Sequence, residues 1–258
     1  MIQVKKSTPT KLKSINLEAD MPLINRHALR ELSPDEVFAF PVILSTNDVD
    51  RDGEFFTTST LNEFAKLYVG KSGIFDHSWT AQGQTARIYK AEIEDGDGLT
   101  ATGEKLKLLR AYAYIPRIDS NAVIIAEIES GIKKEVSIGC SVKSKTCSIC
   151  GATAHRCEHN HMEEYDGEIC YFALDGAADV YEWSFVAVPA NIAAGVTKSA
   201  ADVLAALDVV LGADFADYPE KAEELKQKFA EMALSAEEKK LRAEIIERNK
   251  AFLSGGKK

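Results

Sequence analysis

The chain has 258 residues, of which 45% are hydrophobic and 28% charged, and its formal net charge is −9. The length fits one sizeable domain with an appendage or two small domains, and the composition is ordinary for a globular protein. The acidic balance disfavours a nucleic-acid partner, because such a surface repels phosphates. No apolar run is long enough to span a bilayer and the N-terminus lacks a signal-peptide core, so we expect no membrane contact and a cytosolic location.

The first half of the chain predicts an N-terminal arm, then strands and one helix. The arm covers residues 1–34 and is polar and basic at its start. Residues 38–44 are β-branched and aromatic, which indicates a strand, and the cluster 47–53 indicates a turn. A calcium loop is disfavoured there, because Ser59 stands where such a loop has its bidentate glutamate. Residues 58–68 have helical spacing behind a cap at Ser59. Further β-like runs span residues 73–77, 86–93 and 99–104.

The second half predicts a buried helix, more strands and a helical tail. The apolar run 122–128 fits a buried helix that ends at Gly131. Two β-like runs follow later, at 169–174 and 180–188. From about Thr197, alanine, leucine, glutamate and lysine dominate, so we expect residues 197–258 to form a tail of amphipathic helices.

Three segments supply a serine, a histidine and a carboxylate of the kinds that hydrolases combine. Ser137 lies in a strand-like run of strict alternation and shares its face with Gly139, which we expect to leave an open surface for a substrate backbone. The apolar face of that run holds Val136, Ile138, Cys140 and Val142.

His77 ends a strand-like run, and Glu182 shares a period-2 face with Ser184. The opposite face of that strand is expected to hold Tyr181, Trp183 and Phe185. A base activates a serine hydroxyl best when a third group fixes its tautomer.

Together these segments resemble the prohead (capsid-maturation) proteases of tailed bacteriophages, which are distant relatives of the herpesvirus assemblins. The matching pieces are a Gly-x-x-x-His stretch ending at His77, a Glu-Val-Ser-Ile-Gly block around Ser137, and a Glu-x-Ser-x-Val-x-x-Pro-Ala-Asn block over residues 182–191. The turn at 50–53 also looks like the start of the family's sequence. The resemblance covers roughly residues 35–195.

The resemblance implies a role for each candidate residue. Ser137 would be the nucleophile, His77 the general base, and Glu182 the group that orients the imidazole. Assemblins use a second histidine in the third role, and Asp179 and Asp175 remain alternatives here. Nothing in the sequence identifies the oxyanion donors.

The implied fold is α+β, a mostly antiparallel β-barrel protease core flanked by helices, with the protease domain at residues 35–196. The implied activity is a serine endopeptidase that cleaves scaffold protein, segments of the major capsid protein and itself, inside the assembling procapsid in the host cytoplasm. Assemblin relatives dimerise, so a homo-oligomer is a further expectation. Cys140 stands where an aromatic residue is common in the family, which points to altered specificity.

A cluster of cysteine and histidine residues predicts a metal site in an insert at residues 145–162. Three of the five cysteines lie within eleven residues, and in the cytosol such crowding indicates a metal rather than disulfides. The predicted ligands are Cys147, Cys150, Cys157 and His159. His155 or His161 is an alternative to His159. A closed Cys₃His set is typical of structural Zn²⁺, so we expect a structural zinc and no catalytic metal.

Two other functions are compatible with the sequence. The first is a non-enzymatic, zinc-braced phage head or scaffold component with an inactive protease fold; the intact His77, Ser137 and Glu182 set argues against it. The second is a zinc-ribbon adaptor that binds nucleic acid; the acidic balance and the lack of clustered arginine and aromatic residues argue against it.

Overall fold

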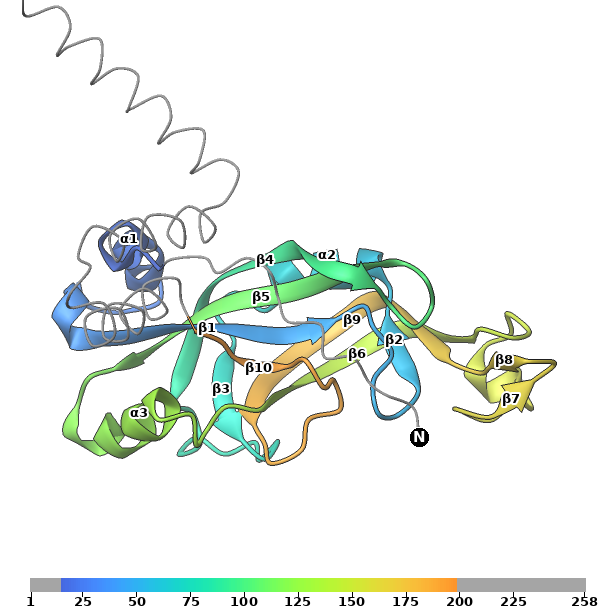
Figure 1. Ribbon diagram of the computed structural model, residues 1–258. Coiled ribbons are helices and arrows are strands. Elements are labelled where there is room, and N and C mark those ends of the chain that lie inside the picture. Colours follow the sequence, from blue (N-terminus) through green and yellow to red (C-terminus); the bar gives the residue numbers. More distant parts are fainter. Residues whose placement is uncertain (1–14, 199–258) are drawn as a thin grey trace, which may run out of the picture. The chain divides into compact units, whose positions relative to one another are not determined.

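The computed structural model describes residues 15–198, so the predicted C-terminal tail, 197–258, lies outside the described residues except for its first two (Figure 1). The chain divides into two compact units, and the elements below belong to the first. Its helices are α1 (Leu17–Asn25), α2 (Thr58–Leu67) and α3 (Ala122–Glu129), with turns of 3₁₀ helix at Pro34–Glu36, Asp119–Asn121 and Ala154–Arg156. Its strands are β1 (Val37–Thr46), β2 (Glu54–Phe56), β3 (Ser72–Phe75), β4 (Ala86–Leu99), β5 (Lys105–Pro116), β6 (Val136–Cys147), β7 (Glu164–Tyr165), β8 (Glu168–Ile169), β9 (Phe172–Phe185) and β10 (Gly195–Val196).

The main sheet has eight strands in the order β10-β1-β5-β4-β3-β9-β2, and β6 pairs with β9 off this path. Most pairs are antiparallel, whereas β2 and β3 both run parallel to β9. The unit is therefore α+β with mostly strand content, as predicted. The expected closed barrel is not seen within residues 15–198, although an isolated bridge between Glu135 and Gly195 joins the start of β6 to β10.

Helix α2 packs its apolar face into the core, as its spacing predicted. Leu61 and Phe64 are buried, and Tyr68 at its C-terminal cap is buried as well. The predicted cap at Ser59 is wrong by two residues, because the Thr57 hydroxyl accepts the Thr60 N–H at 3.2 Å. The helix predicted at 122–128 is confirmed as α3, which buries Ile124, Ile125 and Ile128.

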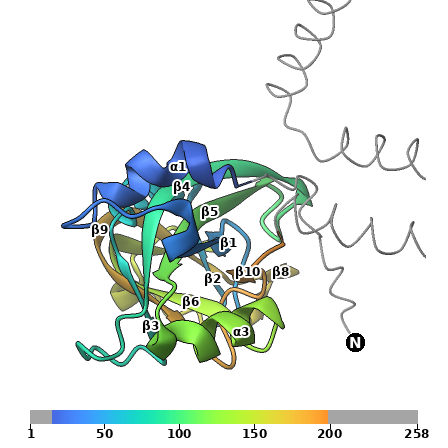
Figure 2. The same cartoon turned by 90° about the vertical axis from the view of Figure 1, so that its left-hand side faces the viewer.

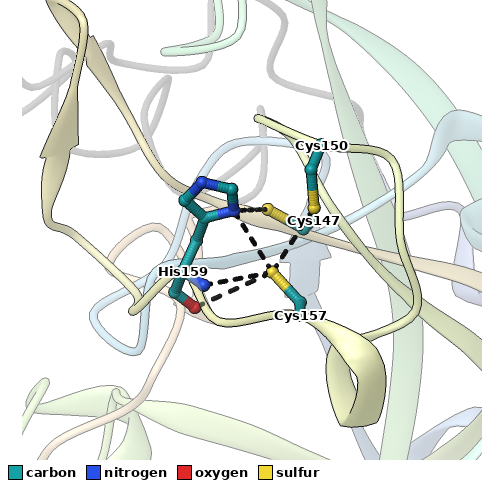
Figure 3. Close-up of side chains that lie close together, drawn as sticks. All are labelled: Cys147, Cys150, Cys157 and His159. Atoms are coloured by element: carbon teal, nitrogen blue, oxygen red, sulfur yellow. Dashed lines mark hydrogen bonds between the residues drawn. The ribbon is translucent and has the colours of Figure 1, made fainter.

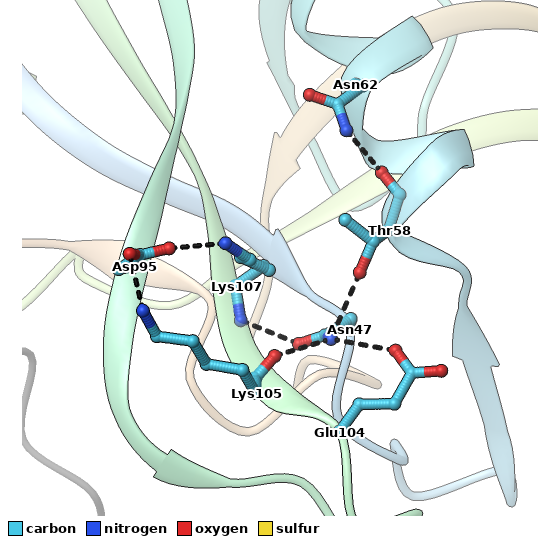
Figure 4. Close-up of polar contacts among 7 residues, drawn as sticks. All are labelled: Asn47, Thr58, Asn62, Asp95, Glu104, Lys105 and Lys107. Carbon is cyan, nitrogen blue, oxygen red and sulfur yellow. Dashed lines mark hydrogen bonds and ion pairs between the residues drawn. The ribbon is translucent and has the colours of Figure 1, made fainter.

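The run 86–93 continues through Leu99 as β4, so the predicted separate strand at 99–104 is wrong. A polar ladder supports this extension, because the Asp95 carboxylate pairs with Lys105 at 2.6 Å and also with Lys107 (Figure 4). Nearby, the buried Asn47 amide accepts the Lys107 N–H at 2.7 Å and donates to the Lys105 carbonyl at 3.0 Å (Figure 4). The alternation of apolar and polar residues therefore predicts too short a strand, because ion pairs and side-chain hydrogen bonds to the backbone extend it.

Helix α1 was missed by the sequence analysis and falls within the predicted arm. It begins where the Asn16 side chain accepts the Ala19 N–H at 3.2 Å, and it buries Met21 and Ile24. It lies beside β4 (Figure 2). The Tyr89 hydroxyl on β4 donates to the Asp20 carboxylate at 3.1 Å. Among the described residues there is no helix with both the length and the apolar character needed to cross a membrane.

Candidate active site and metal centre

Strands β6 and β9 bring the serine and the glutamate onto one face. In their antiparallel register Ser137 lies opposite Ser184, and Gly139 lies opposite Glu182. Directly opposed residues of an antiparallel pair project to the same side of a sheet. The apolar face of β6 packs as predicted, with Val136 buried and Ile138, Cys140 and Val142 against the core. Ser137 therefore lies on β6 two residues before Gly139, the residue that faces Glu182.

His77 reaches the same face because the backbone turns sharply at the end of β3. Asp76 and His77 have φ of 50° and 53°, in the left-handed region that ordinary residues seldom adopt. The turn is fixed on β9, where the Asp76 N–H donates to the Phe185 carbonyl at 3.0 Å and the His77 N–H to the Ser184 hydroxyl at 3.0 Å. Two consecutive residues of this strained kind are therefore held by β9, and they aim the imidazole back across it.

The imidazole of His77 and the carboxylate of Glu182 form a hydrogen-bonded pair. Nδ1 of His77 lies 2.8 Å from Oε1 of Glu182, and Oε2 of Glu182 accepts the Ser184 hydroxyl at 2.7 Å. Glu182 and Ser184 are buried, whereas the His77 side chain is 42% exposed. A carboxylate only accepts hydrogen bonds, so Nδ1 carries a proton, and in the neutral imidazole Nε2 therefore keeps its lone pair. This is the tautomer that a general base requires.

Gly139 does not leave the open surface that its sequence context suggested. An ideal Cβ built on Gly139 would lie 2.2 Å from Oε1 of Glu182, so the carboxylate fills the space above the glycine. The glycine of the Gly-x-x-x-His stretch has a similar role, because a Cβ on Gly73 would lie 2.5 Å from the Trp183 ring. Both glycines are therefore needed for close packing around the His77–Glu182 pair.

A β-bulge changes the direction of Tyr181. Gly139 pairs with Glu182 but Cys140 pairs with Val180, so Tyr181 is an extra residue on β9. Its hydroxyl donates to the Ser141 hydroxyl at 3.0 Å, and it lines the same cavity as Glu182. The prediction that Tyr181 faces away from Glu182 is therefore wrong, because a bulge interrupts the period-2 alternation. Trp183 and Phe185 are buried on the other face, as predicted.

The other two carboxylates proposed for the third position have different partners. Asp175 accepts the Thr57 hydroxyl at 2.6 Å, at the start of α2. Asp179 accepts the N–H of Val180 at 2.8 Å. Within the described residues Glu182 is thus the carboxylate that contacts His77. Ser137 makes no hydrogen bond to His77 in the same part of the chain.

Ser137 lines a cavity of about 310 Å³. Other residues of its lining are Asp50, Asp52, Cys140, Ala190 and Asn191. Backbone contacts hold this wall together, because the Arg51 N–H donates to the Ala190 carbonyl at 3.1 Å and the Arg51 guanidinium also contacts the Pro189 carbonyl. The turn at 50–53 and the Pro-Ala-Asn block, far apart in sequence, therefore meet beside Ser137.

Two groups in this cavity are unsuited to be the reacting centre. Burial raises the pKa of the Cys140 thiol to about 12, so it holds almost no thiolate at neutral pH. The Asp50 carboxylate accepts the N–H groups of Asp52 and Glu54 at 2.9 and 3.0 Å, which closes the turn that the sequence predicted. Ser45 and Ser141 also line it, but the Ser45 hydroxyl donates to the Thr46 carbonyl and the Ser141 hydroxyl is bound by Tyr181, which leaves Ser137 as the nucleophile candidate.

The metal-ligand residues predicted in the insert come together in space. The side chains that do so are Cys147, Cys150, Cys157 and His159 (Figure 3). Their ligand atoms all lie within 4.8 Å of one another, and Nδ1 of His159 is 3.4 Å from the Cys157 sulfur. This cluster can hold a metal ion. Figure 1 shows the insert at the end of β6 and β9 remote from α1 and α3.

Hydrogen bonds favour Cys147 as a ligand and engage one of the alternative histidines elsewhere. Burial opposes ionisation of Cys147, but N–H groups of Cys150 and Ile149 donate to its sulfur and lower its pKa to about 6. Of the alternative histidines, His161 binds outside the cluster, and His155 is not part of it. The cysteine that the spacing did not single out, Cys170, lies 3.6 Å from Cys147. Its place beside the cluster was not predicted, because Cys170 comes from a separate segment of the chain.

The insert is joined directly to the wall of the Ser137 cavity. Nδ1 of His161 lies 2.8 Å from the Asp52 carbonyl, and its ring stacks on Phe172 at a centroid distance of 4.3 Å. The Phe172 N–H donates to the Gly53 carbonyl at 2.9 Å. A carbonyl oxygen only accepts, so His161 donates from Nδ1. The segment that follows the metal cluster therefore holds the turn that lines the cavity.

Comparison with known proteins gives no relative for this chain: no family model, no curated protein and no solved structure matches it.

Proposed function

We propose that the protein is a serine endopeptidase of phage head assembly. Ser137 is the nucleophile, His77 the general base, and Glu182 the group that orients the imidazole. The observation that carries the proposal is the 2.8 Å contact between His77 Nδ1 and Glu182 Oε1, on the sheet face that Ser137 shares. This contact leaves the Nε2 lone pair of His77 free to accept a proton.

In the proposed reaction His77 Nε2 takes the proton of Ser137 as the hydroxyl attacks the scissile carbonyl. The same nitrogen then gives that proton to the leaving amine, and water repeats the cycle on the acyl-enzyme. Buried Glu182 stabilises the imidazolium that forms in each half of the cycle. Ser137 and His77 make no hydrogen bond here, and such contacts commonly tighten only when substrate binds.

The substrates in this proposal are scaffold protein, capsid-protein segments and the chain itself, cleaved within the procapsid in the host cytoplasm. A barrel-like protease core and self-association belong to the same proposal. They rest on the resemblance of the His77, Ser137 and 182–191 segments to prohead proteases.

Structural zinc is proposed for the Cys/His cluster. Three thiolates and one imidazole match the ligands that Zn²⁺ prefers, and a four-ligand set has no open position for substrate. The ion would contribute folding free energy to a short insert that has little core of its own.

Intact-mass analysis of the purified wild-type chain beside Ser137→Ala tests the protease. Truncation in the wild type that vanishes in the variant, together with covalent labelling of Ser137 by a fluorophosphonate, is the expected result. An unlabelled, whole wild-type chain in the presence of the cognate capsid and scaffold proteins would favour the alternative, a non-enzymatic head component with an inactive protease fold.

A further inference from the structure

A second cavity, of about 520 Å³, lies on the His77 side of the candidate active site. We call it the tryptophan cavity; its lining includes Ile74, Trp79, Asp179, Val180, Tyr181 and Glu182. Glu182 both lines this cavity and binds His77, so one side chain connects the cavity to the imidazole. The volume is in the range of pockets that bind organic groups.

Two aromatic rings form an accessible wall of this cavity. Trp79 is 70% exposed and Tyr181 is 41% exposed, and their ring centroids are 5.4 Å apart at an interplanar angle of 51°. Large aromatic side chains that remain exposed beside a reacting centre are costly in water unless something covers them. The pair therefore presents apolar area that a ligand can bury.

The Tyr181 side chain and the loop that carries Trp79 are held in place before any ligand arrives. The bulge on β9 turns Tyr181 toward Glu182, and its hydroxyl is fixed by Ser141 at 3.0 Å. The loop that carries Trp79 is closed by the Thr80 N–H to the Ser78 carbonyl at 2.8 Å and by the Gly83 N–H to the Thr80 hydroxyl at 3.1 Å. A preorganised wall loses little entropy on binding.

The charges of the lining disfavour an acidic group. Lys71 and Asp179 contribute one charge of each sign. The Glu182 carboxylate is already bound by His77 and Ser184. The lining therefore keeps an excess of negative charge, which disfavours an acidic side chain, and each Glu182 oxygen already has a partner.

We propose that the tryptophan cavity is the subsite for an aromatic or large aliphatic side chain of the polypeptide substrate, with Trp79 and Tyr181 as its specificity-determining residues. This subsite rests on the proposed protease function, because it is the function that places a peptide beside His77.

Binding can be measured without catalysis, because the chain has only two tryptophans and they differ in environment. Trp183 is fully buried, so its indole N–H signal in ¹⁵N–¹H NMR is an internal control for folding. The probes are blocked pentapeptides of glycine with a central Phe, Leu, Ala, Lys or Glu, titrated into the full chain carrying Ser137→Ala. Trp79→Phe assigns the two indole signals.

The Phe and Leu peptides are expected to move the Trp79 signal and leave the Trp183 signal in place. Their Kd values should be about tenfold or more below those of the Ala, Lys and Glu peptides, from the apolar area that a large side chain buries. Tyr181→Ala should weaken the Phe peptide about tenfold. Leu99→Ala, which removes a 72% exposed side chain outside the cavity, should not change its Kd.

Equal responses to all five peptides, or an unmoved Trp79 signal, would overturn the subsite. The protease proposal is tested separately, by fluorophosphonate labelling of Ser137 in the wild type. Absence of labelling overturns the protease whatever the peptides do, and absence of peptide selectivity overturns the subsite whatever the labelling shows.

Discussion

Gly139→Ala is the substitution for which the structure gives the sharpest expectation. The added Cβ would lie 2.2 Å from Glu182 Oε1 and 3.1 Å from its Cδ, whereas real Cβ contacts stay at 3.0 Å or more. The φ of Gly139 lies outside the left-handed region, so alanine fits the backbone and the clash is confined to Glu182. The carboxylate must therefore retreat by roughly 0.8 Å, the shift that brings 2.2 Å to 3.0 Å. It cannot then keep both its 2.8 Å contact with His77 and its 2.7 Å contact with Ser184.

Overpacking of this kind costs about 1–3 kcal/mol of unfolding free energy. A misdirected base slows a serine hydrolase about 10²- to 10⁴-fold. We therefore expect urea unfolding to show the loss of unfolding free energy, and the rate of fluorophosphonate labelling at Ser137 to show the loss of reactivity.

A double-mutant cycle with Glu182→Ala identifies the cause. In that background the clashing atoms are gone, so adding Gly139→Ala should cost nothing or stabilise slightly, since alanine is less flexible than glycine in the unfolded chain. Leu99→Ala, which removes an exposed side chain outside both cavities, serves as the control for labelling. An equal cost of Gly139→Ala with and without Glu182 would refute the reasoning.

Three further outcomes are expected. His161→Ala should speed hydrogen exchange in the turn that follows β1 and slow labelling of Ser137, while the zinc content stays unchanged. His161→Gln restores a donor to the Asp52 carbonyl and should reverse both effects, with His155→Ala as the control. Loss of zinc from His161→Ala would instead make His161 a ligand. Cys147→Ser should lower the zinc content measured by mass spectrometry, and full zinc stoichiometry in the variant would contradict the ligand set. Chelation of zinc from the wild type should unfold the insert before the sheet. Cys140 should resist alkylation by iodoacetamide at pH 8 in the folded protein. Burial raises the pKa of its thiol to about 12, so the reactive thiolate appears only as the pH nears that value. Rapid alkylation would show that the thiol is not buried as described.

Local chemistry determined much of what the sequence predicted. Alternation identified the buried face of β6, helical spacing identified α2, and an apolar run that ends at a glycine identified α3. The close spacing of Cys147, Cys150 and Cys157 identified the cluster with His159. These predictions succeed because the interacting residues are near neighbours in the chain, so the periods of helix and strand or the reach of one short loop decide them.

Only the tertiary structure decided the arrangement of the site. His77 and Glu182 are 105 positions apart and meet because β3 runs parallel to β9, a pairing that neither strand specifies alone. The bulge that turns Tyr181 toward Glu182 depends on the register between β6 and β9, and the filling of the space above Gly139 depends on the same register. Register is set by the packing of whole faces and by hydrogen bonds between distant strands, so a local period cannot reveal it.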